Sequence, residues 1–349
     1  MDTPPLRHLY VNPAGQCNLA CKHCWIAPSR THEPFRVRER LVDEFTTEQF
    51  ADLLHQAFEL GLKHIKFTGG EPLLRSDFPE LYRISSEYPS EELIIDIETN
   101  GTLVPDGLWS VLEKHPPGQV AVSLDSILEK EHDSFRCTPG AWIRTVSFIE
   151  ELVRRDITTQ VIMSINKLEV DPVLSMALFC QNKAISSLKI NPIQPIGRGV
   201  NISVSQKYIN ELIDFADEIH TVCGRSVSFT IPQAFLPINR LSNADRCPIL
   251  NLLGVLPDGA ISFCGIGFSC SSLIMGSFLK NDLRDIWANS DLLRKLRTEV
   301  PARFEDICGN CIHAGKCLGE CVMQNYYSYG NFTSSYWICQ RADEAGIFP

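Results

Sequence analysis

The chain has 349 residues, of which 44% are hydrophobic and 21% are charged, a composition typical of globular proteins. It has no apolar run of about 18 residues, and the N-terminal stretch MDTPPLRHLYVNPAG lacks the basic start and apolar core of a secretory signal. The net charge of −10 comes without a basic tract, which argues against nucleic acid or a membrane as partner. We therefore expect a cytoplasmic protein.

Short apolar runs alternate with helical patterns from Leu6 to about residue 231. Capping chemistry at Thr46–Glu48 predicts a helix that ends at Gly61, and further helices are expected at 142–154 and 206–222. Strands are expected at 9–11, 64–67, 93–97, 120–124, 160–165 and 187–190. Six strands alternating with helices predict an α/β fold with a parallel sheet, wound or partly closed into a partial (β/α)6 TIM-like barrel. In such a fold we expect the functional residues at the carboxyl ends of the strands.

After about residue 232 this rhythm stops, and cysteine, glycine and turn residues dominate. Little apolar periodicity remains beyond a helix expected at 283–296, so this part should have a small core that needs metal for stability. We predict two domains, residues 1–235 and a cysteine-rich part at 236–349.

Fourteen cysteines are many for a cytoplasmic chain, and clustered thiols there are interpreted first as metal ligands. Cys17, Cys21 and Cys24 form C-x3-C-x2-C directly after the first strand. One interpretation is a zinc site that takes a fourth ligand from His23 or elsewhere. The other is a 4Fe–4S cluster with three cysteine ligands and one open iron.

Polar and glycine residues follow the other predicted strands. Gly69-Gly70-Glu71-Pro72 follows the second strand, where glycines let the backbone approach a ligand closely. Together with the cysteine trio, these strand ends resemble the radical S-adenosylmethionine (radical SAM) superfamily over about residues 6–231. The matching positions beyond Gly69–Pro72 are Asn100, Ser123, Asp125, Arg136 and Asn191.

The resemblance implies that the open iron binds S-adenosylmethionine, whose cleavage gives a 5′-deoxyadenosyl radical that abstracts hydrogen from a substrate. It implies that Gly69 and Gly70 meet the methionine amino end and that Arg136 pairs with the carboxylate. The remaining cofactor-binding candidates, some of them for ribose or carboxylate oxygens, are Glu71, Pro72, Asn100, Ser123 and Asn191. Asp125 is the candidate catalytic base, with a structural hydrogen bond as the alternative.

Two positions depart from the family pattern. His23 occupies a slot that is often aromatic, so Trp25 either takes over the adenine-side contact or belongs to the core. Cys137 stands where relatives usually have glycine, and we expect it, like Cys180 and Cys223, to be an apolar filler.

A second cysteine group, C-x2-C-x5-C-x3-C, starts at Cys308, and a zinc ribbon is the alternative to iron–sulfur ligation there. With the upstream cysteines, a tight turn at 257–259 and the downstream Cys339, it resembles the SPASM extension of radical SAM peptide and protein maturases. The resemblance implies two auxiliary 4Fe–4S clusters, hence three in all. Their expected ligands are Cys247, Cys264 and Cys321 for the first and Cys308, Cys311, Cys317 and Cys339 for the second. Cys270 either completes the first cluster or leaves one iron open.

Our first hypothesis is maturation of a ribosomally made peptide by a C–C or C–S crosslink or a related modification. Sulfatase maturases are the rival, but they usually carry an aspartate at the position of Gly265. The third hypothesis is a non-catalytic iron–sulfur or zinc protein that carries electrons or binds a partner. The motifs at the strand ends argue against it, because such a protein needs no pocket for S-adenosylmethionine. The first strand starts near Leu6, so we expect no leader-binding domain ahead of it. The substrate would then be recognised by a separate leader-binding protein or bound directly. By the resemblance, the reductant is a flavodoxin or a ferredoxin.

Overall fold

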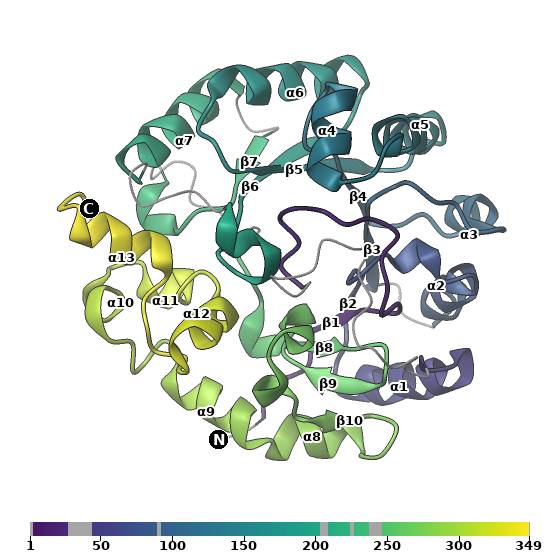
Figure 1. Cartoon of the computed structure of the whole chain (residues 1–349). Coiled ribbons are helices and arrows are strands. Elements are labelled where there is room, and N and C mark those ends of the chain that lie inside the picture. The colour runs from purple at the N-terminus through teal and green to yellow at the C-terminus, as the bar shows by residue number, and fades with distance from the viewer. Residues whose placement is uncertain are drawn as a thin grey trace.

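The computed structural model describes residues 3–26, 44–88, 92–202, 209–223, 227–236 and 246–348. Within these residues, ten strands form one sheet in the order β10-β9-β8-β1-β2-β3-β4-β5-β6-β7. Strands β1 to β7 are parallel neighbours that lie along an open arc (Figure 1). Their bounds are β1 (His8–Val11), β2 (His64–Phe67), β3 (Ile94–Thr99), β4 (Gln119–Ser123), β5 (Thr159–Ile165), β6 (Ser187–Pro192) and β7 (Val227–Phe229). The predicted α/β fold with a parallel sheet is confirmed, and β7 is an addition to the six expected strands.

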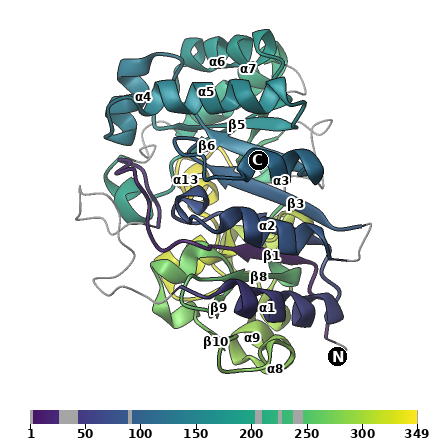
Figure 2. The ribbon, with the colours of Figure 1, turned by 90° about the vertical axis from the view of Figure 1, so that its right-hand side faces the viewer.

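Helices cover the outer face of the arc, and Figure 2 shows several of them stacked over the strands. The first helix begins at the predicted cap, where the Thr46 hydroxyl accepts from the Gln49 N–H and the Gln49 side chain accepts from the Thr46 N–H. Its apolar stripe, including Phe50 and Leu53, is buried against the sheet. The helices of this part are α1 (Thr47–Glu59), α2 (Phe78–Ser86), α3 (Leu108–Lys114), α4 (Glu129–Arg136), α5 (Ala141–Arg154), α6 (Val170–Asn182) and α7 (Ile209–Cys223).

Burial alternates from residue to residue along these strands, except in β4, where Val120 to Val122 are all buried. The side chains that face the helices, such as Val11, Phe67 and Ile97, are buried and apolar. Those between them are half-buried and mostly polar, so the inner wall of the arc is polar. A closed TIM barrel has a packed interior lined by branched apolar side chains. The inner wall here is polar instead.

The second part of the chain continues the same sheet. Strand β8 (Leu252–Val255) pairs in parallel with β1, with Leu253 opposite Leu9. The predicted turn at 257–259 is confirmed, because β8 runs antiparallel to β9 (Ala260–Ser262) and Gly259 has φ +76°. Strand β10 (Gly276–Ser277) completes this edge. The sheet therefore crosses the boundary expected near residue 235, which itself stays a prediction.

Two expectations for this part are wrong. The single helix expected at 283–296 is two helices, because Ser290 has an extended backbone with ψ 126°. The small separate core is also absent from the described residues, since Trp287, Phe332 and Ile338 belong to the same buried cluster as Leu9. The helices are α8 (Leu283–Asn289), α9 (Asp291–Glu299), α10 (Asp306–Asn310), α11 (Ala314–Cys317), α12 (Val322–Tyr329) and α13 (Trp337–Glu344).

Short 3₁₀ helices occupy several of the connections. In the described residues they are Pro72–Leu74, Gly197–Asn201, Gln233–Phe235, Ile249–Asn251, Gly265–Phe268 and Ser271–Leu273. None of the helices in the described ranges is long and apolar enough to cross a membrane.

Candidate active site

The first cysteine group lies in the loop after β1, at the carboxyl end of the sheet (Figure 2). Cys17 and Cys24 pack beside a small buried cluster that contains Cys21. Burial raises the pKa of the Cys17 thiol, and the nearby Glu71 and Cys21 raise it further. Burial also raises the pKa of Cys21, to about 11. Thiols with raised pKa values, such as Cys17 and Cys21, ionise readily only beside positive charge, so they fit as ligands of a cationic iron cluster.

The two glycines after β2 pack against this cysteine loop. Gly69 has φ +108°, and a Cβ there would lie 2.7 Å from the Asn12 side chain. A Cβ on Gly70 would lie 2.2 Å from the carbonyl oxygen of Gln16, which accepts the Glu71 N–H at 2.9 Å. Both glycines are thus needed to bring the two loops together, and their predicted contact with S-adenosylmethionine stays a prediction.

Glu71 and Asn100 tie the ends of β2 and β3 to the same loop. The buried Glu71 carboxylate accepts the Thr99 hydroxyl and two backbone N–H groups at 2.6–3.0 Å. Burial raises the pKa of Glu71 to about 6 in spite of these bonds. The Asn100 amide donates to Asn18 Oδ1 at 3.0 Å and lies 3.8 Å from Cys17 Sγ. Pro72 is buried and begins the 3₁₀ helix that follows Glu71.

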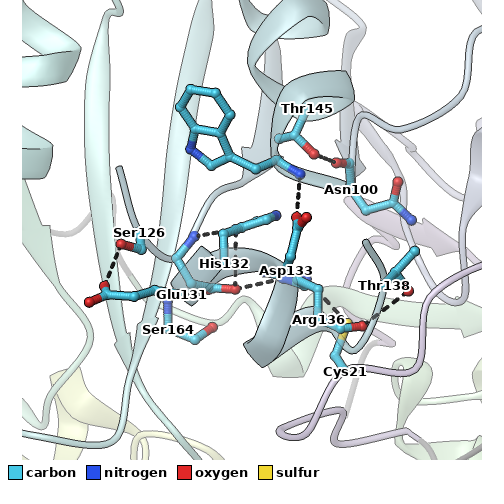
Figure 3. A network of polar contacts seen from close by, with 12 residues as sticks. Cys21, Asn100, Ser126, Glu131, His132, Asp133, Arg136, Thr138, Thr145 and Ser164 are labelled. Carbon is cyan, nitrogen blue, oxygen red and sulfur yellow. Dashed lines mark hydrogen bonds and ion pairs between the residues drawn. The ribbon is translucent and has the colours of Figure 1, made fainter. Parts of the chain in front are cut away.

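Asp125 and Arg136 form a buried ion pair. Figure 3 shows the polar network around it, with Arg136 lying beside Cys21. Asp125 Oδ2 accepts from Arg136 Nε at 2.6 Å, and Oδ1 accepts from the Ser164 N–H at 3.0 Å. Burial alone would raise the pKa of Asp125, but Arg136 holds it below its usual value. Arg136 Nη1 lies 3.6 Å from Cys21 Sγ. Both carboxylate oxygens are therefore engaged, which favours the structural alternative for Asp125 over the base.

His132 extends this network on α4. Its ring is buried, and Nδ1 accepts the Asp125 N–H at 3.2 Å. Burial lowers the pKa of His132 to about 4, so the ring is neutral near pH 7. The Asp133 carboxylate accepts the N–H groups of Gly140 and Trp142, which fixes the start of α5.

Ser123 and Asn191 lie on the inner wall at the ends of β4 and β6, with β5 between them. Both are half-buried. Asn191 Oδ1 accepts the Thr230 hydroxyl at 2.7 Å. The two predicted cofactor contacts therefore lie on the same inner wall, on separate strands.

A charged ladder on the inner wall was missed in the sequence analysis. Lys66 Nζ donates to Glu98 Oε1 at 2.9 Å, and the Thr68 hydroxyl donates to Oε2 at 2.9 Å. Lys66 also lies 4.8 Å from the centre of the Tyr10 ring. Against the opposing effect of burial, Lys66 lowers the pKa of Glu98 to about 2. Polar residues at every second position of β1–β3 were the signal that could have revealed this wall.

The second-part thiols fall into two groups of electrostatic neighbours. Besides burial, Cys321, Cys264 and Glu320 raise the pKa of Cys247. Besides burial, Cys308, Cys317, Cys311 and Glu320 raise the pKa of Cys339. The cysteines in these two sets are those that the resemblance assigns to one cluster each, and the assignment itself stays a prediction.

No three His, Cys, Asp or Glu side chains in the described ranges converge closely enough to hold a single metal ion. In a four-iron cluster each thiolate binds a different iron, so the ligands surround a wider body. Cys270 is half-buried with Sγ 3.1 Å from Ser272 Oγ, and its place in the first auxiliary cluster stays a prediction.

The lone cysteines differ from one another. Cys180 is buried, as expected of an apolar filler, and Cys223 is half-buried. For Cys137 the expectation is wrong, because it is exposed and has φ +54°. This left-handed backbone suits glycine, which accounts for the residue usual at this position in the family.

Trp25 and Gly265 join the first cysteine loop to the second part of the chain. The Trp25 indole lies over Gly265, where a Cβ would come within 3.0 Å of the ring. Ser269 Oγ donates to the carbonyl oxygen of Trp25 at 3.3 Å. Sequence reasoning missed this contact, since it joins residues 240 positions apart in the chain.

The loop after β6 makes a second connection. The Arg198 N–H donates to the Cys24 carbonyl oxygen at 3.0 Å. Gln194 Oε1 accepts the Tyr336 hydroxyl at 2.6 Å and Trp337 Nε1 at 3.1 Å, at the start of α13. This loop therefore spans from the first cysteine group to the helix that carries Cys339.

Two models of known protein families match this chain. The model of the radical SAM superfamily matches residues 11–180, and that of the iron-sulfur cluster-binding SPASM domain matches residues 247–312. The chain belongs to the radical SAM superfamily. It is a radical SAM enzyme of the SPASM subfamily, and these two domains imply 4Fe–4S clusters and S-adenosylmethionine as cofactors.

Curated relatives of this radical SAM chain carry two kinds of names. An AdoMet-dependent heme synthase of Oleidesulfovibrio alaskensis is 25% identical, over 97% of this chain and 88% of the relative. The mycofactocin maturase MftC of Mycobacterium tuberculosis is 22% identical, over 89% of this chain and 77% of the relative.

Solved structures share the fold. Streptococcus suis SuiB bound to the precursor peptide SuiA has a TM-score of 0.74 at 17% identity, covering 97% of this chain and 76% of SuiB. The protein anSMEcpe with bound AdoMet has a TM-score of 0.72 at 18% identity, covering 97% and 95%.

Proposed function

We propose that this radical SAM enzyme matures a ribosomally made peptide, by removing hydrogen from one residue to give a C–C or C–S crosslink or a related modification. The observation that carries the proposal is the contact between Trp25 and Gly265, which brings the first cysteine loop against the first auxiliary group. A substrate held there would meet both the radical source and a second redox centre. The name of MftC and the peptide bound to SuiB support a peptide substrate.

In this proposal Cys17, Cys21 and Cys24 hold the first cluster, and the strand-end residues hold S-adenosylmethionine. When bound, these two groups supply the radical that removes a hydrogen atom from the substrate. Arg136, fixed by Asp125, places positive charge beside Cys21. The inner wall around Lys66 and Glu98 orients polar parts of the substrate. Three clusters, a cytoplasmic location, a flavodoxin or ferredoxin reductant and a separate leader-binding protein belong to the same proposal.

The sulfatase-type alternative is disfavoured by the packing at position 265. An aspartate there would need a Cβ 3.0 Å from the Trp25 ring and 3.1 Å from Asn12 Oδ1. Contacts that short require a neighbour to move. A different second candidate, radical modification of a tetrapyrrole, is supported by the heme synthase relative, which aligns with 97% of the chain.

The first test is iron and sulfide analysis of anaerobically reconstituted protein with an assay of 5′-deoxyadenosine. We expect about twelve irons per chain, falling by about four with loss of cleavage in the variant Cys17→Ala/Cys21→Ala/Cys24→Ala. Cys137→Gly is the matched control, because Cys137 is exposed and outside the predicted ligand sets. Zinc in place of iron, or cleavage that survives the triple variant, would contradict the proposal.

Substrate class needs a separate experiment. The active enzyme is incubated with a translated peptide library or with iron coproporphyrin III, and products are identified by mass spectrometry. A peptide that loses hydrogen in step with 5′-deoxyadenosine formation supports the proposal. A modified porphyrin and unmodified peptides favour the second candidate instead.

A further inference from the structure

Trp25 stands between two predicted clusters. It directly follows Cys24 of the first group, and Gly265, against which it packs, directly follows Cys264 of the first auxiliary group. The position of a Cβ on Gly265 lies 3.0 Å from Trp25 Cη2 and 3.5 Å from Cζ2. Because Gly265 has no side chain, part of the Trp25 indole can occupy the space beside it.

Three segments hold the backbone around Trp25 in place. The Cys24 carbonyl oxygen accepts the Arg198 N–H, and the Trp25 carbonyl oxygen accepts the Ser269 hydroxyl. The next residue, Ile26, is buried against Phe268. Despite these contacts, Trp25 as a whole is 39% exposed. The backbone that carries the indole is thus held in place, part of the ring packs at Gly265, and more than a third of the residue is left accessible.

A fixed, partly open indole is well suited to bind a flat group. Its position is set before binding, so little conformational entropy is lost when a ligand stacks on it. Two aromatic rings that meet offset-stacked or edge-to-face gain stabilisation beyond that from the area they bury, which an aliphatic partner of the same size would lack. The contact with Gly265 turns the ring toward the auxiliary part of the chain, whereas the predicted S-adenosylmethionine contacts lie on the ends of β2, β3, β4 and β6.

We propose that Trp25 is a specificity-determining residue whose exposed part binds an aromatic side chain of the substrate peptide, between the first cysteine group and the first auxiliary group. This inference rests on the proposed peptide maturase function and adds the class of side chain that the site takes.

Binding is measured on the reconstituted enzyme with S-adenosylmethionine and without reductant, so that no turnover is needed. The probes are N-acetyl-L-tyrosinamide and N-acetyl-L-leucinamide, followed by saturation-transfer NMR. Wild type should prefer the tyrosine amide. Trp25→Leu keeps apolar bulk but has no flat face, and it should weaken the tyrosine amide about tenfold while changing the leucine amide little.

Trp25→Phe should stay within about threefold of wild type, because it keeps a ring. Trp109→Phe, on α3, is the matched control and should bind as wild type. No preference in the wild type, or equal binding of the tyrosine amide by Trp25→Leu, overturns the inference. Weaker binding of S-adenosylmethionine alone would instead assign Trp25 to the adenine. Loss of 5′-deoxyadenosine formation would remove the proposed function but leave these binding results standing.

Discussion

Asp125→Asn separates a structural carboxylate from a catalytic one. Asparagine can still accept the Ser164 N–H, so the change removes mainly the charge that faces Arg136 at 2.6 Å. Breaking a buried ion pair by removing one partner costs about 3–5 kcal/mol, and we expect the lower end, about 3 kcal/mol, because one hydrogen bond is kept. At about 2 °C per kcal/mol for a chain of this size, the unfolding midpoint should fall by about 6 °C.

The assay is anaerobic thermal unfolding of the reconstituted protein by circular dichroism, with 5′-deoxyadenosine measured in parallel. Glu150→Gln is the control, since Glu150 and Lys183 form an exposed pair that should contribute less than about 1 kcal/mol. The pKa of Asp125 is lower in the folded state, so its stabilisation is present above the unfolded pKa and is lost as pH falls through the folded pKa. The variant should therefore lose less stability in acid. An unchanged midpoint with cleavage intact but no product would refute this reasoning and make Asp125 the base.

Two further changes test how loops hold the cysteine groups. Gly70→Ala would place a Cβ 2.2 Å from the Gln16 carbonyl oxygen and so disturb the first cysteine loop. Iron analysis of this variant should show a loss of about four irons per chain. Gly315→Ala is the control and should keep all of its iron, because the space around Gly315 is open. Full iron in Gly70→Ala would contradict the packing role. Gln194→Leu leaves two buried donors at the start of α13, Tyr336 and Trp337, without their acceptor, which should cost about 2–4 kcal/mol. It should also alter the electron paramagnetic resonance spectrum of the cluster that Cys339 is predicted to hold. An unchanged spectrum and midpoint would show that Gln194 does not position α13.

Local signals in the sequence were sufficient for the barrel part. The cap at Thr46 and the apolar spacing after it predict α1 because both depend on neighbours within one or two turns. Strands such as His64–Phe67 were equally visible, since each is bounded by glycine or polar residues. The cysteine spacing together with Gly69–Pro72 pointed to the family before any geometry was available, and the matches to residues 11–180 and 247–312 confirm it.

Long-range packing could not be predicted in the same way. Nothing near Leu252 in the sequence shows that it begins a strand paired with β1, because that pairing joins distant segments. The loop glycines Gly69 and Gly70 were assigned to a ligand, which stays a prediction, and their packing against Asn12 and Gln16 was not foreseen. Asp125 was recognised as important, but its two partners come from a helix and a strand that sequence spacing does not bring together.

The continuous sheet constrains how the two parts of the chain can move. Strand β8 is hydrogen-bonded to β1 along its length, and the Asn12 backbone and side chain both donate to the Val255 carbonyl oxygen at 2.9 Å. Asn12 leads into the loop of the first cysteine group, and Val255 belongs to the hairpin that leads to Cys264. A hinge between the parts would have to break this ladder together with the contact between Trp25 and Gly265. We therefore infer that the sheet fixes the separation of the first and the first auxiliary cysteine groups, since a hinge between them would break the sheet.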